Sequence, residues 1–174
     1  VGLWTNCGDW DSVQHRPSGW YIPPAGNRII SKGQYVPVCG MNLCIKREAL
    51  PLFWFPLMGR GQPYRRFDDI AAGIIAKKTM DQLNWHLSVG EPFVEHRRAS
   101  DLKVNREKEA PGIEWNERFW EIIDNIKLTG SNSLECVREI GTGLLGNSEP
   151  YHQRLGKALG IWSSLFSKHP SLEF

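Results

Sequence analysis

Cysteine is scarce in this 174-residue chain. The four cysteines, Cys7, Cys39, Cys44 and Cys136, form neither the dense pattern of a secreted disulfide scaffold nor the paired C-x-x-C knuckles of a structural zinc site. We therefore expect reduced, structural cysteines and a cytoplasmic location. Cys39 and Cys44 are five residues apart in an extended-looking segment, which favours opposite faces of a strand over a shared metal site.

Long hydrophobic runs and an excess of one charge are also lacking. The apolar run from Leu50 to Leu57 is far shorter than the roughly 20 residues of a spanning helix, and Pro51 and Pro56 interrupt it. No membrane span is predicted, although peripheral contact with a membrane stays open. The net charge of +2 is too small to indicate a nucleic-acid partner. With 41% hydrophobic and 23% charged residues, the composition is that of one globular domain.

The order of sequence patterns predicts an α/β fold in three parts. Residues 1–35 indicate an irregular arm with scattered aromatics, residues 36–110 an α/β core, and residues 111–174 a helical cap. Exposed sheet edges would favour self-association or a partner chain. The expected elements are strands at 35–45 and within 85–96, a short helix or turn at 46–50, and helices at 68–83, 114–125, 133–145 and 150–166.

Two adjacent carboxylates, Asp68 and Asp69, stand at the start of the helix predicted at 68–83, after the glycine-rich turn 59–63. The positive end of a helix and the neighbouring Arg65 and Arg66 favour the ionised form of such acids. The pair therefore indicates chemistry on a polar substrate. The simpler interpretation is that one of the two acids only caps the helix.

Six motifs follow one another along the sequence. They are Gly2-Leu3-Trp4, Cys39-Gly40-Met41-Asn42-Leu43, Leu57-Met58-Gly59-x-Gly61-Gln62-Pro63, Arg66-Phe67-Asp68-Asp69-x-x-Ala72-Gly73, His96-x-x-Ala99-Ser100 and Val104-Asn105-x-x-Lys108-Glu109. In this order the six blocks resemble the reversibly glycosylated polypeptides, a family best known for the plant UDP-arabinopyranose mutases. The resemblance spans residues 2–120 with nearly collinear spacing and weakens in the C-terminal helices.

The resemblance implies a GT-A-like nucleotide-sugar enzyme, of which this chain covers the C-terminal half. The nucleotide-binding strands and the aspartate-rich metal motif of the family would lie in the other half. Asp9-Trp10-Asp11 has the letters of such a motif, but it falls in the irregular arm and is rejected as the metal site. The start at Val1, without methionine or a leader, also suggests a piece of a longer protein.

Roles for individual residues follow from this resemblance. Asp68 and Asp69 would orient acceptor hydroxyls or act as the base, and His96 would be a ligand of a divalent cation, Mn²⁺ or Mg²⁺. His96 as an ordinary surface histidine, and Asn42 as a residue that satisfies its own backbone, are the alternatives. The expected contacts with the sugar or the diphosphate are Gly40, Met41, Asn42, Gly61, Gln62, Arg66, Arg97, Arg98 and Lys103.

Two hypotheses about function remain open at this point. In the first, the chain supplies the acceptor side of a glycosyltransferase or UDP-sugar mutase site. In the second, it is a binding or assembly module that has lost catalysis. Arg60 and Arg65 depart from the family pattern, which usually has an acid and a small residue there, so the preference for sugar or acceptor is open as well.

Overall fold

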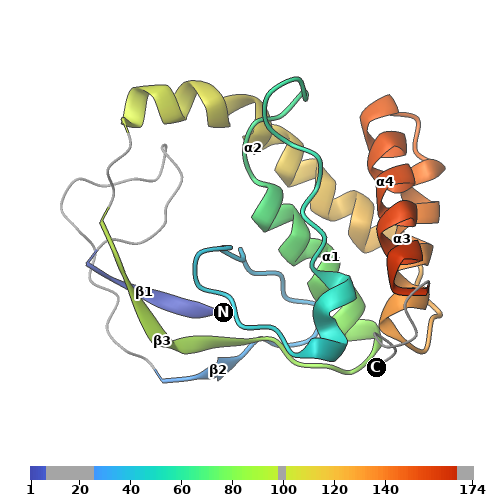
Figure 1. The fold of residues 1–174 in the computed structure, drawn as a ribbon, viewed down its shortest axis with the longest axis horizontal. Coiled ribbons are helices and arrows are strands. Elements are labelled where there is room, and N and C mark those ends of the chain that lie inside the picture. The colour runs from blue at the N-terminus through green and yellow to red at the C-terminus, as the bar shows by residue number, and fades with distance from the viewer. Residues whose placement is uncertain (7–25, 98–100, 168–174) are drawn as a thin grey trace.

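The fold is mixed α/β, as the sequence predicts (Figure 1). The structure is a computed structural model that describes residues 1–6, 26–97 and 101–167. Most of its helical part gathers on one side of the molecule, and its small sheet lies on the other, together with the helix segment drawn in yellow. The elements are β1 (Gly2–Asn6), β2 (Arg28–Ile29), the 3₁₀ helix η1 (Arg47–Leu52), α1 (Asp68–Gln82), β3 (Ser88–His96), α2 (Leu102–Asn125), α3 (Ser133–Leu145) and α4 (Pro150–Ser167).

The described strands form a three-stranded sheet in the order β1-β3-β2. β1 runs parallel to β3, with Gly2 opposite Gly90 and Asn6 opposite His96, whereas β2 is antiparallel to β3. The prediction of an irregular arm over residues 1–35 is therefore wrong at 2–6 and 28–29, where β1 and β2 form. Positions 7–25 of that arm lie outside the described residues. The predicted extended pieces between 85 and 96 merge into the single strand β3, which ends at His96 as expected.

The strand predicted at 35–45 is wrong. Residues 30–46 contain no strand and turn at 40–42. Pro37 lacks a backbone N–H for a sheet ladder, and the amide of Gly40 bonds to the side chain of Asp69 instead of to a neighbouring strand. The apolar residue Val38 is 1% exposed, so the run is buried against a helix rather than within a sheet.

Helix α2 begins twelve residues before the predicted start at Glu114. Asp101 caps it, accepting a hydrogen bond from Val104 N at 3.0 Å. The helix continues through Pro111, a residue that removes one helical hydrogen bond and favours a kink. Figure 1 shows that α2 changes direction along its length. The segment before residue 114, where no helix was predicted, is thus helical from Leu102 onward.

The other helices and the core match the predictions. α1, α3 and α4 lie within one or two residues of the expected bounds, and α3 packs on α4. Cys39 and Cys136 are buried thiols, and Cys44 is exposed. In the described ranges, no helix is long and apolar enough to cross a membrane. One hydrophobic core joins the helices; its fully buried members include Leu52, Ile75, Phe119, Ile140, Leu155 and Leu159.

Candidate functional site

The N-terminus of α1 is set by Phe67, which is the N-cap residue and has a left-handed backbone (φ 80°). The Phe67 ring fills the space beside Gly112 of α2, where an added Cβ would lie 2.6 Å from Phe67 Cδ2. Asp68 and Asp69 therefore occupy the first turn of the helix rather than the N-cap. The interpretation of either acid as the capping residue is wrong, and both carboxylates lie at the positive end of the helix.

The carboxylate of Asp69 connects α1 to the turn at 39–42. Its Oδ2 accepts a hydrogen bond from Gly40 N at 3.1 Å, and its Oδ1 accepts one from Ile70 N at 2.9 Å. Met41, on the same turn, is 52% exposed. Two blocks that are well separated in the sequence thus meet at one point. Gly40, Met41 and Asp69, all predicted site residues, are brought together here.

Asp68 has a different environment. It is half-buried, and within the described part of the chain its carboxylate forms no hydrogen bond or ion pair. It lies near Tyr151 of α4, whose hydroxyl donates to Leu57 O at 2.7 Å. Burial raises the pKa of the Tyr151 phenol, and the negative charge of Asp68 adds to that increase. A substrate at this helix end would meet Asp68 first as a hydrogen-bond acceptor.

The early part of α2 also faces this helix end. Arg66 Nη2 donates to Asn105 Oδ1 at 3.4 Å. Asn105 and Glu109 are 7% and 8% exposed, and with Gly112 they form one face of the helix. Sequence reasoning gave Asn105 and Glu109 no role. Their spacing of four within one block would have indicated a shared helical face if the helix had been predicted to start before them.

The glycine-rich turn at 59–63 precedes α1 and is hydrogen-bonded to α4. Gly59 and Gly61 have φ values of 106° and 80°, which favour glycine. Gln62 Oε1 accepts a hydrogen bond from Arg154 Nη1 at 3.1 Å. Arg60, between the two glycines, is exposed. The turn is thus a tight loop with an exposed cationic side chain between its two glycines.

Asn42 is hydrogen-bonded to strand β1 in this structure. Its Nδ2 donates to Leu3 O at 2.9 Å, its backbone O accepts from Gly2 N at 2.9 Å, and the residue is 8% exposed. These contacts join the 39–42 turn to β1. Contact of Asn42 with a sugar stays a prediction.

The remaining predicted residues form a second group at the end of β3, apart from the start of α1 (Figure 1). His96 ends the strand, Arg97 forms an ion pair with Glu95 at 2.8 Å, and Lys103 is exposed in the first turn of α2. Arg98 lies outside the described residues. Basic side chains near a strand end suit the oxygens of a diphosphate.

The structure allows a test of whether the chain alone fits a metal ion. Among residues 1–6, 26–97 and 101–167, no three His, Cys, Asp or Glu side chains are placed to hold one. The described residues therefore do not form a metal centre by themselves. His96 as one ligand of a cation stays a prediction that requires ligands from elsewhere.

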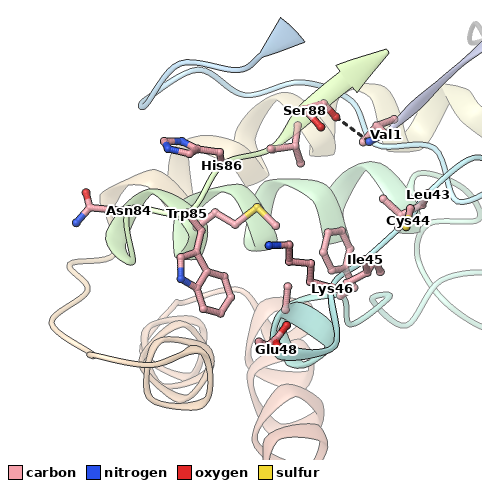
Figure 2. A pocket seen from close by; sticks show the side chains of 14 residues that line it. Val1, Leu43, Cys44, Ile45, Lys46, Glu48, Asn84, Trp85, His86 and Ser88 are labelled. Carbon is pink, nitrogen blue, oxygen red and sulfur yellow. Dashed lines mark hydrogen bonds between the residues drawn. The ribbon is translucent and has the colours of Figure 1, made fainter. Parts of the chain in front are cut away.

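A cavity of about 470 Å³ lies at the opposite end of α1 from the acid pair (Figure 2). Its wall includes Lys46, Met80 and Trp85, and Val1 N donates to Ser88 O at 2.8 Å at its edge. The acid pair does not line this cavity. This cavity and the convergence of sequence blocks are thus two separate places. The candidate site is placed at the convergence, where hydrogen-bond donors and acceptors lie close together.

Comparison with known proteins agrees with the resemblance seen in the sequence. The family model described as reversibly glycosylated polypeptide matches residues 1–171. Among similar proteins, probable UDP-arabinopyranose mutase 4 of Arabidopsis thaliana is 34% identical over 171 residues, which cover 92% of this chain and 47% of that protein. UDP-arabinopyranose mutase 3 of the same plant is 32% identical over 185 residues, covering 99% of this chain and 50% of that protein.

A relative from maize, probable UDP-arabinopyranose mutase 1 of Zea mays, is 34% identical over 176 residues, covering 92% of this chain and 47% of that protein. The chain thus spans about half the length of the curated relatives it matches.

Proposed function

Because the chain belongs to the reversibly glycosylated polypeptide family, we propose that it supplies the acceptor side of a site that transfers or rearranges the sugar of a UDP-sugar. The named relatives are UDP-arabinopyranose mutases, so UDP-arabinopyranose is the first substrate to test. The nucleotide-binding side of the site would come from sequence outside this chain.

The observation that carries the proposal is the meeting of family blocks at the start of α1. The Asp69–Gly40 bond and the Arg66–Asn105 bond join three blocks at one helix end. Residues that pack only for stability need no such concentration of polar groups at a surface-accessible helix end. Hydroxyl groups of a sugar, in contrast, need several donors and acceptors close together.

In this proposal the residues of the chain bind and orient the acceptor. Asp68 accepts a hydrogen bond from an acceptor hydroxyl, and the exposed turn at Gly40 and Met41 contacts the sugar. The second group, Arg97, Arg98 and Lys103, neutralises diphosphate oxygens. A divalent cation would add charge neutralisation when bound.

The test is conversion of UDP-arabinopyranose by the complete protein, in which this chain is joined to the sequence that supplies the nucleotide-binding side, followed by chromatography of the nucleotide sugars. We expect turnover that falls by about 100-fold or more in Asp68→Asn, since general-base and orienting groups contribute on that scale. Glu117→Gln removes a charge from an exposed position of α2 and is the matched control, which should keep wild-type turnover. Binding of the UDP-sugar without any turnover would contradict the enzyme and favour a binding module.

A further inference from the structure

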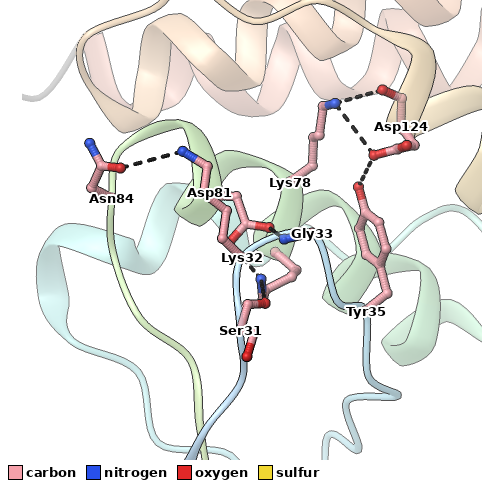
Figure 3. Close-up of polar contacts among 9 residues, drawn as sticks. Ser31, Lys32, Gly33, Tyr35, Lys78, Asp81, Asn84 and Asp124 are labelled. Atoms are coloured by element: carbon pink, nitrogen blue, oxygen red, sulfur yellow. Dashed lines mark hydrogen bonds and ion pairs between the residues drawn. The ribbon is translucent and has the colours of Figure 1, made fainter.

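A row of α1 side chains holds the 31–40 segment along the helix, beginning near the C-terminal end of α1 (Figure 3). Asp81 Oδ2 accepts a hydrogen bond from Gly33 N at 2.9 Å. Lys77, which is 2% exposed, donates from Nζ to Ser31 O at 3.0 Å and pairs with Asp81 Oδ1 at 2.5 Å. The beginning of the segment is therefore fixed to the helix by charged side chains.

The same row continues to the N-terminal end of α1, because residues four apart share a helix face. At Gly73 an added Cβ would lie 2.6 Å from Val38 Cγ2, so the segment passes directly over the helix backbone there. One turn further, Asp69 bonds Gly40 N. Asp69 is thus the last member of a row that positions the whole 31–40 segment.

This placement separates the roles of the two adjacent acids. Both oxygens of Asp69 accept backbone N–H bonds, from Gly40 and Ile70, which leaves that carboxylate committed to the protein. Asp68 points off the row by one residue, about 100° around the helix, and its carboxylate has no such partners among the described residues. Charge and helix position are shared by the two acids, but their bonding is not.

We infer that Asp69 is a positioning residue that fixes the Gly40–Met41 turn, whereas Asp68 is the carboxylate that meets the substrate. The inference rests on the proposed function and refines it. Asp68 takes the proton of the acceptor hydroxyl as the acceptor oxygen bonds to the anomeric carbon. The bond from that carbon to the diphosphate oxygen breaks, and its electron pair leaves with the diphosphate.

The experiment compares Ala and Asn substitutions at both acids, with two readouts. Amide hydrogen exchange at Gly40 reports the tether and needs no activity, and conversion of UDP-arabinopyranose reports chemistry. Asp69→Ala should raise exchange at Gly40 by about tenfold or more, because the bond to a charged acceptor is lost. Asp69→Asn keeps an acceptor oxygen and should restore most of both the protection and the turnover.

At position 68 the pattern should be reversed. Asp68→Asn should lose as much turnover as Asp68→Ala, because an amide cannot take the proton, and neither should change exchange at Gly40. Asn132→Ala, which removes the cap of α3 by deleting the acceptor of Glu135 N, is the control for general loss of stability. In this control, exchange at Gly40 should rise by no more than the loss of global stability accounts for.

Three outcomes decide the inference. Unchanged exchange at Gly40 in Asp69→Ala would overturn the positioning role. Rescue of turnover by Asn at position 68 but not at position 69 would reverse the two assignments and overturn the inference. Absence of turnover in the complete wild-type protein, which includes the nucleotide-binding side, would refute the proposed function and the Asp68 role with it, while the exchange result would still decide the role of Asp69.

Discussion

His152 of α4 is buried against α2, and both nitrogens of its ring have partners. The indole Nε1 of Trp115 donates to His152 Nε2 at 3.0 Å, so that nitrogen carries no proton. On the other side, Nδ1 lies 3.1 Å from Asn147 Oδ1 and 3.2 Å from Glu149 Oε2. Burial lowers the pKa of His152, and the carboxylate of Glu149 opposes that effect. The folded protein therefore holds this histidine neutral.

We predict that unfolding free energy falls as pH decreases below about 6.5, the ordinary pKa of histidine, because the unfolded chain takes up the proton more readily than the folded one. The His152 contribution changes by at most about 1.4 kcal/mol per pH unit. Urea unfolding between pH 5 and 8 measures it. His152→Gln should flatten this part of the profile, whereas His86→Gln, at an exposed histidine, should not. Equal slopes in wild type and His152→Gln would contradict the prediction.

At the scale of elements, α1 organises the site by letting a neighbouring segment approach closely. Gly73 lies in the helix interior, where glycine costs about 1 kcal/mol relative to alanine. The structure supplies the reason for it, since Val38 packs against the position that a Cβ would occupy. The other polar members of the row then come within hydrogen-bond distance of the same segment.

Gly73→Ala should therefore destabilise the protein by about 1–3 kcal/mol, in spite of the better helix propensity of alanine. Gly160→Ala is the matched control in α4, where an added Cβ meets nothing within 4 Å, and it should stabilise by up to about 1 kcal/mol. Thermal and urea unfolding measure both. Adding Val38→Ala to Gly73→Ala should recover part of the loss. If Gly73→Ala stabilises the protein as much as Gly160→Ala, the close approach of Val38 does not require glycine at position 73.

Over the whole molecule, the polar contacts shown in Figure 3 attach the part of the chain before η1 to the helical layer. Lys77 and Asp81 hold the turn at 31–33, and Tyr35 Oη donates to Asp124 Oδ1 at 2.8 Å near the end of α2. The sheet and the 39–42 turn are thus connected to the same core as the acid pair. Self-association of the molecule stays a prediction.

Lys77→Met should cost about 3 kcal/mol of unfolding free energy, because it leaves the largely buried carboxylate of Asp81 without its cation. The neighbouring Lys78→Met is the control: its partner Asp124 is 48% exposed at the side chain, so the loss should be about 1 kcal/mol or less. Chemical denaturation at constant pH measures the difference. Equal losses in the two variants would show that burial of the Lys77–Asp81 pair does not increase its contribution to the unfolding free energy.

The sequence by itself determined the family and the three helices α1, α3 and α4. Helix periodicity and capping residues are local, so the bounds of these helices could be read within one or two positions. The ordered blocks likewise indicated the family, and the match of the family model to residues 1–171 confirms it. The acid pair was correctly placed at the start of a helix for the same local reasons.

Only the tertiary structure decided how the neighbouring segments meet that helix. The run at 35–45 has the residues of a strand, but its backbone partner Asp69 is far away in sequence. The passage of α2 through Pro111 brings Gly112 against the ring of Phe67, a contact that no local pattern predicts. The different environments of Asp68 and Asp69 depend on the segment that crosses one face of α1. Contacts between residues distant in sequence decide these features, and local pattern contains no information about them.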